Sequence, residues 1–174
     1  MEYEMRYPSP VGELTIRANA SGVTVLALEE DAHRGQYLSG PASPCVPGEE
    51  PEILAKTRQW LDDYFGGKAP DVSGLLLTPS GTTFQEKVWR TLRSIPYGET
   101  VTYGALADKL NSSPRAVGSA VGRNPISILI PCHRVVGTDG SLTGYAGGLP
   151  AKRTLLALEG VALDRTRDRL ARDK

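Results

Sequence analysis

The chain has 174 residues, of which 40% are hydrophobic and 23% are charged, and these are ordinary values for a globular protein of one or two domains. No apolar run reaches the ~18 residues of a membrane span, and the N-terminus lacks a signal-peptide core, so we expect a cytoplasmic protein that binds no membrane. Two cysteines and two histidines without paired spacings exclude a disulfide framework and argue against a metal site.

Charge is divided unevenly along the chain. Residues 1–78 hold 6 basic and 12 acidic side chains, whereas residues 79–174 hold 14 basic and 8 acidic ones. This division predicts an acidic front domain (1–78) and a basic back domain (79–174) that could meet an anion such as nucleic acid. Alternatively, the C-terminal arginines form only a solvated tail, interleaved with Asp164, Asp168 and Asp173. The charge distribution by itself is therefore only weak evidence for DNA binding.

The front part has the pattern of a small sheet with a helix. Residues 3–29 alternate apolar and polar side chains around a turn at 19–22, which is typical of antiparallel strands. Residues 38–51 are rich in Ser, Pro and Gly and predict an exposed loop, in which Cys45 has no ionisable neighbour. A helical pattern then runs from Pro51 to Phe65 and ends at two glycines. We expect a small α/β scaffold domain without chemistry of its own.

The back part is mainly helical. Residues 70–81 connect the two parts, and the leucines at 75–77 could add an edge strand. The spacing of apolar residues predicts a helix over 83–94, a second helix capped by Thr102, and a third that begins at Pro114 and runs to about residue 123. Two short helices about a tight polar turn fit a winged-helix-like helix-turn-helix. The predicted fold class is α+β.

The third of these helices is unusual in its small residues. It carries Ala116, Gly118, Ser119, Ala120 and Gly122, although glycine lowers helix propensity by about 1 kcal/mol relative to alanine. Small residues permit close backbone approach, either to DNA or to another helix, and the sequence favours neither. Arg115 begins the helix, where the helix dipole disfavours a cation. That position makes sense if Arg115 meets a phosphate or a base.

The run Ile128–Gly137 holds the candidate nucleophile. A thiol, an imidazole and a guanidinium (Cys132, His133, Arg134) follow each other between apolar flanks, where polar groups cost several kcal/mol unless they are paired. A thiolate is the nucleophilic form of cysteine, and a basic neighbour lowers its pKa. The alternative is an inert buried cysteine. Glu159 ends a predicted helix over 151–159, where a partner such as His133 would offset the unfavourable dipole; otherwise it is an exposed surface glutamate.

Together these residues resemble a known family. Ile128–Val136, preceded by Arg115–Gly118 and Asn124–Pro125, resembles the 6-O-alkylguanine-DNA alkyltransferases, also called methylated-DNA–protein-cysteine methyltransferases. The resemblance extends from about Thr82 to Gly160, and the first half is similar only in pattern. It implies a monomer that acts on double-stranded DNA containing 6-O-alkylguanine, without a cofactor. Some family members carry zinc in the first domain, and this chain lacks those ligands.

The resemblance also implies roles for individual residues. Cys132 would accept the alkyl group, His133 would deprotonate it through a water, and Glu159 would orient His133. Arg115 would enter the base stack from the minor groove in place of the flipped guanine. Tyr103 would donate a proton to N3 of that guanine.

Other residues would support the reaction. Asn124 would brace the turn between the recognition helix and the nucleophile. Backbone groups of Cys132, Val135 and Ala146 would read the base, and Ala146 stands where the family often has serine, so its N–H remains but a hydroxyl does not. The loop neighbours of Ala146 would complete the base-binding set, namely Tyr145 and Gly147. The DNA-binding set would be completed by Thr102, Ala116, Gly118 and Ser119.

The chemistry predicts a single turnover. Transfer of an alkyl carbon to sulfur gives a thioether, which has no carbonyl for water to attack, so the protein is consumed. Two other functions remain open from the sequence. One is a lesion-sensing relative that binds without transfer, although such proteins replace the cysteine that is present here. The other is a cysteine hydrolase built on Cys132 and His133, which would leave the helix-turn-helix and Arg115 without a purpose.

Overall fold

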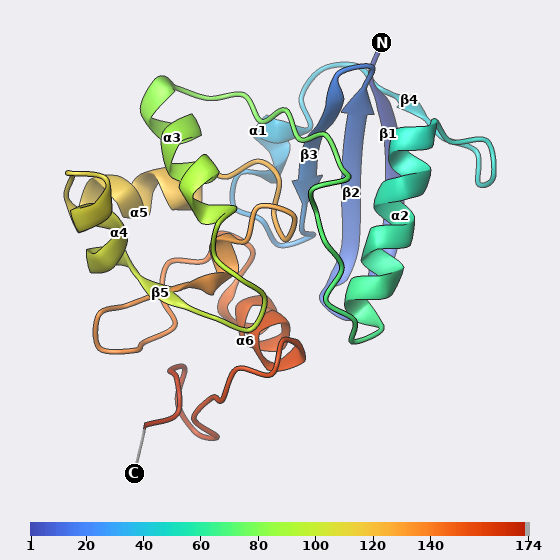
Figure 1. The fold of residues 1–174 in the computed structure, drawn as a ribbon. Coiled ribbons are helices and arrows are strands. Elements are labelled where there is room, and N and C mark those ends of the chain that lie inside the picture. The colour runs from blue at the N-terminus through green and yellow to red at the C-terminus, as the bar shows by residue number, and fades with distance from the viewer. Residues whose placement is uncertain (173–174) are drawn as a thin grey trace.

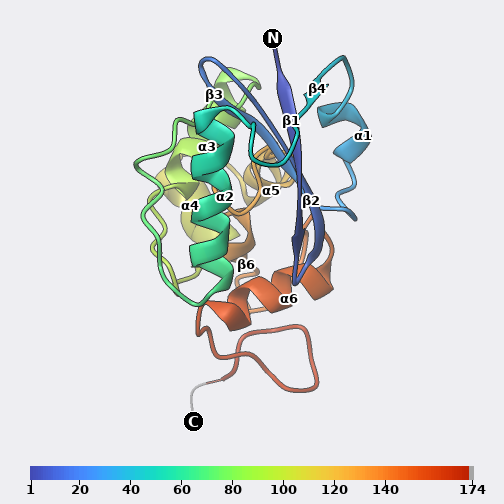
Figure 2. The same cartoon turned by 90° about the vertical axis from the view of Figure 1, so that its right-hand side faces the viewer.

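A four-stranded sheet forms the front part of the computed structural model, which describes residues 1–172. Its strand order is β3-β2-β1-β4, and the first three strands are antiparallel hairpins, as the alternating pattern predicted. Helix α2 packs along the sheet, and a single turn of helix, α1, lies at its far edge (Figures 1 and 2). The bounds are β1 Tyr3–Ser9, β2 Gly12–Asn19, β3 Gly22–Ala27, α1 Arg34–Tyr37, β4 Ser43–Pro44 and α2 Glu52–Phe65.

The front part differs from the expectation in two places. The loop over 38–51 contributes the short strand β4, which pairs in parallel with β1. The leucines at 75–77 form a single bridge to Val23 of β3 instead of a strand, because Pro79 follows and a proline cannot donate to a ladder. The polar face of β2 is also buried: Arg17 pairs with Glu4 at 2.8 Å and donates to carbonyls of residues 38–40.

The back part contains the expected helices, and a hydroxyl cap starts the first three of them. The last helix, expected over 151–159, spans Leu149–Leu158 and has no side-chain cap. Thr82 forms a capping box with Gln85, Thr102 accepts from the N–H of Ala105 at 3.0 Å, and Ser113 caps the helix that Pro114 begins. The first helix ends at residue 92, two residues earlier than expected, in a tight turn before Pro96. The bounds are α3 Thr83–Leu92, β5 Val101–Thr102, α4 Tyr103–Lys109, α5 Pro114–Gly122, the 3-10 turn η1 Cys132–Arg134, β6 Val135–Val136 and α6 Leu149–Leu158.

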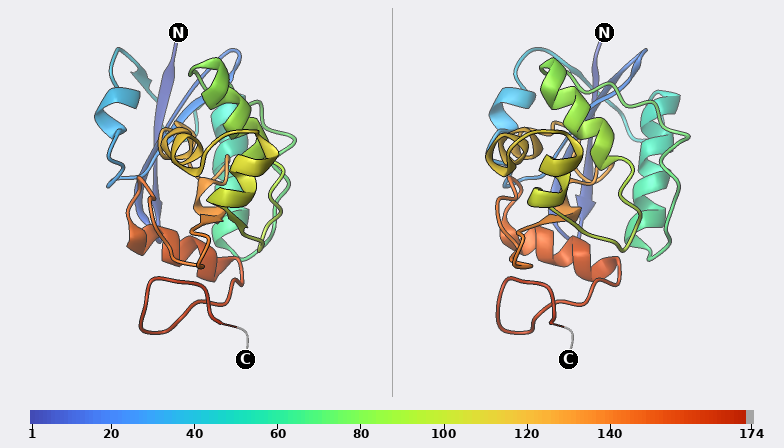
Figure 3. Two further views of the ribbon diagram at one scale, coloured as in Figure 1. Left: turned by 90° about the vertical axis from the view of Figure 1, so that its left-hand side faces the viewer. Right: turned by 60° about the vertical axis from the view of Figure 1, so that its left-hand side comes forward.

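One hydrophobic cluster runs through both parts of the molecule. The backbone joins them too, because Leu26 of β3 donates to Pro125 O at 2.9 Å and its carbonyl accepts from Ser127 N at 3.0 Å. The segment that leads from α5 to η1 therefore lies along the free edge of the sheet (Figure 3). Among residues 1–172, no helix has the length and apolar character to cross a membrane.

Candidate active site

A strained bend between α5 and η1 positions Cys132, the candidate nucleophile. Ile128 has φ 70°, a conformation that a β-branched residue rarely adopts. Asn124 holds the bend from inside: its Nδ2 donates to Ile130 O at 2.9 Å, and its Oδ1 accepts from Ile126 N at 3.0 Å. Strain of this kind costs of order 1–3 kcal/mol and persists only where the surroundings enforce it. The bracing contacts predicted for Asn124 are therefore present.

Cys132 begins η1 and is only 5% exposed. Burial raises the pKa of its thiol, and the opposing influences are a hydrogen bond from Asn124 and the positive charge of Lys152. We expected the neighbouring His133 to lower this pKa, and that expectation was wrong, because burial keeps the imidazole neutral. The thiol is therefore protonated in the free protein at neutral pH, and its proton must leave during the reaction.

His133 and Glu159 form the buried pair that the sequence suggested. The imidazole Nε2 lies 2.6 Å from the carboxylate Oε2, and both side chains are fully buried. An ionised carboxylate only accepts hydrogen bonds, so Nε2 carries the hydrogen and Nδ1 keeps a free lone pair. Among the described residues Nδ1 has no hydrogen-bond partner. Burial also lowers the pKa of His133, which leaves a neutral imidazole able to accept a proton.

Five hydrogen bonds converge on the carboxylate of Glu159. Besides His133, the donors are Tyr64 Oη at 2.5 Å, Gly98 N at 3.1 Å, and Arg134 through Nε at 2.7 Å and Nη2 at 3.1 Å. Burial alone would raise the pKa of Glu159, but the bonds from His133, Arg134 and Tyr64 hold it well below its usual range. Sequence reasoning missed Tyr64, since nothing in its helix links it to a residue 95 positions away.

Lys152 is a second residue that the sequence did not single out. It is fully buried on α6, and its ammonium donates to Val135 O at 2.5 Å and Thr143 O at 3.0 Å. The same Thr143 carbonyl accepts from the hydroxyl of Tyr103 at 3.2 Å. Lys152 therefore ties the strand after the nucleophile to the glycine-rich loop and to Tyr103. A lysine in an apolar helix pattern gave one available signal for this role.

Lys152 gives a pH dependence that can be measured. Burial lowers its pKa to about 8, whereas an unfolded lysine titrates near about 10.4. Between these values the unfolded chain binds more protons, so stability should rise with pH, by about 3 kcal/mol across the window. In Lys152→Met this rise should vanish, and in the exposed control Lys56→Met it should persist, as measured by urea unfolding at several pH values. An unchanged rise in Lys152→Met would contradict the assignment.

The loop predicted to read the base is held from both sides. Ala146 O accepts from Ala32 N at 3.0 Å, so the front part fixes its backbone. A Cβ added at Gly147 would come within 2.8 Å of the Tyr145 ring and 2.9 Å of Leu28, which explains the glycine. The Tyr145 hydroxyl is buried without a hydrogen-bond partner among the described residues. Val135 is buried directly after η1, and the pKa of Tyr145 is raised by burial and then by the charge of the nearby Cys132.

Tyr103 begins α4 and lies against the recognition helix. Burial, followed by the charge of Cys132, raises the pKa of its hydroxyl to about 12, so Tyr103 keeps its proton. A Cβ added at Gly118 would lie 3.8 Å from the Tyr103 ring. The other α5 residues assigned to DNA form an exposed face: Arg115, Ala116 and Ser119. Thr102 caps α4 through its hydroxyl, which leaves its role toward DNA as a prediction.

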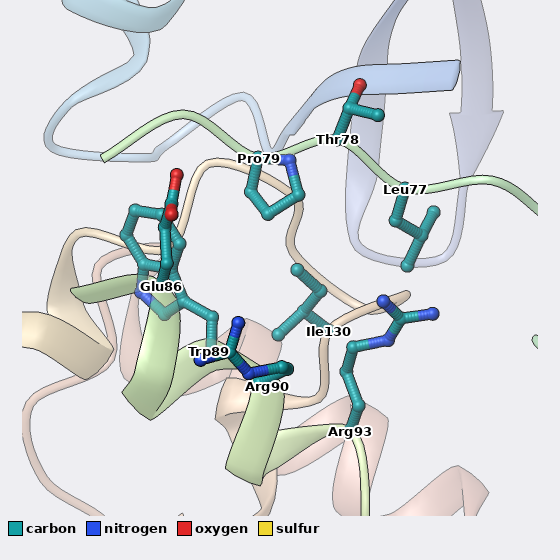
Figure 4. A pocket seen from close by; sticks show the side chains of 8 residues that line it. All are labelled: Leu77, Thr78, Pro79, Glu86, Trp89, Arg90, Arg93 and Ile130. Atoms are coloured by element: carbon teal, nitrogen blue, oxygen red, sulfur yellow. The ribbon is translucent and has the colours of Figure 1, made fainter. Parts of the chain in front are cut away.

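The opposite face of α5 packs inward, so packing on another helix, one of the two uses foreseen for its small residues, is present, and close approach to DNA stays a prediction. Ala120 is buried, and its carbonyl accepts from Trp89 Nε1 of α3 at 2.8 Å. A hollow of about 250 Å³ opens beside this contact, between α3 and the connecting segment (Figure 4). Its lining includes Arg90, Arg93 and Ile130 but not Cys132, so it is separate from the thiol. Within residues 1–172, no His, Cys, Asp and Glu side chains cluster as metal ligands.

Known families match both parts of the chain. Residues 83–161 match the family described as 6-O-methylguanine DNA methyltransferase, DNA binding domain. Residues 3–79 match the ribonuclease-like domain of the same protein class. A methylated-DNA–protein-cysteine methyltransferase of Haemophilus influenzae is 45% identical over 161 residues, which cover 91% of this chain and 87% of that protein. A Methanosarcina acetivorans protein of the same name is 40% identical over 165 residues.

Solved structures agree with this assignment. A Mycobacterium tuberculosis protein in complex with DNA superposes with a TM-score of 0.77 at 40% identity, covering 90% of this chain and 92% of that one. A 6-O-methylguanine-DNA methyltransferase of Pyrococcus kodakaraensis gives a TM-score of 0.68 at 28% identity, over 92% of this chain and all of that one. With its α+β fold and its buried Cys132, His133 and Glu159, this chain belongs to the methylated-DNA–protein-cysteine methyltransferase family.

Proposed function

We propose that this protein repairs DNA by moving an alkyl group from the 6-oxygen of guanine to Cys132, once per molecule. The observation that carries the proposal is the buried hydrogen-bonded pair of Glu159 and His133, which adjoins Cys132 in the segment that follows the helix-turn-helix. A neutral imidazole whose outer nitrogen is locked by a carboxylate is suited to remove a thiol proton. Membership of the family supports double-stranded DNA as the partner and the cytoplasm as the location.

The proposed reaction begins with removal of the thiol proton and ends with a thioether on Cys132 and a neutral guanine. The Cys132 proton passes through a water to His133 Nδ1, and the sulfur attacks the alkyl carbon. The carbon–oxygen bond breaks, its electron pair stays on the guanine, and Tyr103 gives its proton to N3 so that guanine leaves neutral. Because burial raises the pKa of the thiol, proton transfer and attack are expected only once the base lies beside Cys132. The product is a stable thioether.

We infer that the guanine reaches Cys132 by rotating out of the duplex. Extrusion costs a few kcal/mol, and a side chain that fills the gap offsets part of this cost. Arg115 is exposed at the start of α5, with no ion pair to any described residue. Beside it, Ala116, Gly118 and Ser119 offer little bulk between the helix and a groove. The backbone of Val135 and Ala146, flanked by Tyr145 and Gly147, would then hold the base.

The division of labour between the parts is also a proposal. Residues 1–78 would be the scaffold, and residues 79–174 would carry DNA binding and transfer. The contact between Ala32 and Ala146, and that between Tyr64 and Glu159, support a scaffold that holds the site in shape. Separate expression of the back part should therefore give a weakly active protein.

Mass spectrometry tests the proposed function directly. After incubation with a duplex that contains 6-O-methylguanine, the intact protein should gain one methyl group, and peptide mapping should place it on Cys132. The Cys132→Ser variant should bind the same duplex and gain nothing. An unmodified Cys132 in a protein that still binds the lesion would favour a lesion sensor instead. Repeated turnover of an ester would favour a hydrolase.

Tyr103→Phe should slow transfer and leave DNA binding nearly unchanged. The variant keeps the ring against Gly118 and loses only the hydroxyl that would protonate N3. General acids contribute about 10²–10⁴-fold to such rates, so we expect a loss of that order in single-turnover experiments. Tyr7→Phe is a suitable control, because it removes a phenol hydroxyl of the front part that donates to Asp62 and lies outside the predicted site. An equal fall in DNA affinity and rate for Tyr103→Phe would assign the hydroxyl a structural role.

A further inference from the structure

The C-terminal segment beyond the matched DNA-binding region is folded onto the molecule. Residues 161–172, which we call the strap, fold back on themselves through a bridge between Leu163 and Leu170. Both leucines pack on a small hydrophobic cluster around Val136, Leu142 and Leu156. The strap lies below α6 in Figure 1, at the end of the molecule that also holds the loop after β6. It is thus a built surface rather than a loose tail.

The strap is bonded to the turn that follows the nucleophile strand. Leu142 N donates to Asp168 O at 2.8 Å, and Leu170 N donates to Gly140 O at 2.8 Å. Arg169 Nη2 also donates to Asp139 O at 2.8 Å. The other end of this turn reaches the helix-turn-helix, since a Cβ on Gly104 of α4 would lie 3.3 Å from the Thr138 hydroxyl. One continuous surface therefore joins α4, the turn and the strap.

The carboxylates of the strap are already occupied, whereas Arg165 and Arg167 in its middle make no ion pair with a described residue. Asp164 accepts from Thr166 and from Arg167 N within the strap, and Asp168 lies 3.7 Å from Arg153 of α6. The side chains of Arg165 and Arg167 are exposed. No carboxylate of the described residues lies within ion-pair distance of either. Two exposed guanidinium groups thus lie on a folded surface without an ion-pair partner among residues 1–172, and hydrogen bonds from Thr166, followed by the charge of Arg167, lower the pKa of Asp164.

We propose that the strap is a second DNA-binding surface, in which Arg165 and Arg167 contact backbone phosphates of the duplex that α5 engages. Guanidinium groups pair with phosphate oxygens in a forked geometry. The strap that carries them is bonded to the turn after β6, and this turn contacts α4 of the helix-turn-helix. The contacts carry no sequence information and add affinity near any lesion. The inference rests on the proposed DNA-binding function.

The test compares binding to an unmodified duplex across salt concentrations. Each lost phosphate contact lowers the slope of log affinity against log salt by about 0.9. The double variant Arg165→Gln/Arg167→Gln should therefore bind more weakly and lose nearly two units of slope. Arg165→Lys/Arg167→Lys keeps both charges and should retain most of the slope. The rate with free 6-O-alkylguanine base should stay unchanged in both variants, because neither touches the thiol.

A matched control removes the same charge elsewhere. Arg6→Gln/Lys68→Gln changes two exposed cations of the front part, whose side chains are 64% and 74% exposed. If the strap variant and this control show the same slope as the unmodified protein, or the same loss, the proposal is overturned. If the unmodified protein itself binds no DNA, the proposed function fails, which is a separate outcome.

Discussion

Glu159→Gln should lower both the rate of alkyl transfer and the free energy of unfolding by large amounts. The neutral amide keeps the shape of the side chain but removes the charge that Arg134 and His133 share in a fully buried site. Breaking one partner of a buried ion pair costs about 3–5 kcal/mol, because the other charge stays buried without compensation. The amide also no longer fixes Nε2 of His133 as the donor, so the general base loses its orientation, and the rate should fall by roughly 10²-fold or more.

Acid should remove this contribution in the unmodified protein. The pKa of Glu159 lies well below its usual range in the folded state, so its stabilisation is complete above the unfolded value of about 4.3 and is lost as pH falls through the folded pKa. The stability gap between the unmodified protein and Glu159→Gln should therefore shrink at acidic pH. Urea unfolding at several pH values and single-turnover rates measure the two effects.

A surface glutamate gives the matched control for this prediction. The side chain of Glu52 is 83% exposed, and its only ion-pair partner among residues 1–172 is Lys56, so Glu52→Gln should change stability by less than about 1 kcal/mol and leave the rate unchanged. If Glu159→Gln behaves like Glu52→Gln, the carboxylate neither orients His133 nor compensates Arg134. A Glu159→Gln variant that is stable but inactive would show that the carboxylate orients His133 and is not needed to compensate the charge of Arg134.

Local signals in the sequence were enough for the longer strands and helices and for the pair at the centre of the site, but not for the short strand β4. Thr102 and Pro114 start helices because a hydroxyl cap and a proline at the first position act within one turn. The misplaced charge of Glu159 at the end of α6 pointed to a partner, and His133 is that partner. Both inferences needed only the residue and its immediate surroundings.

What the sequence could not reveal depends on contacts between distant elements. The burial of Cys132 reverses the expected direction of its pKa, and burial is a property of the assembled core. Tyr64 reaches Glu159 only because α2 packs against the back part, and Lys152 meets the Thr143 carbonyl only once the loop folds over it. The strap had the composition of a solvated tail, although its two leucines anchor it to a hydrophobic cluster.

Arg115→Ala should impair repair of duplex DNA far more than reaction with the free alkylated base. The arginine is exposed at the start of α5 and makes no ion pair with any described residue, so its removal should leave the fold intact. Without a side chain to occupy the gap, the few kcal/mol needed to extrude the guanine are no longer offset, and the duplex rate should fall by roughly 10²-fold. The free base needs no extrusion, so its rate should change little.

Arg90→Ala is the charge-matched control for this experiment. Arg90 is exposed on α3, where it lines the hollow of Figure 4 away from Cys132, and its removal subtracts the same charge. Single-turnover rates on a methylated duplex, on a methylated single strand and on the free base should separate the variants, with Arg115→Ala most defective on the duplex. A defect of equal size on duplex and free base would assign Arg115 a role in the transfer reaction itself. Equal defects of Arg115→Ala and Arg90→Ala on the duplex would show that only the net charge of Arg115 matters. Either of these two outcomes would contradict the proposal that Arg115 fills the gap in the base stack.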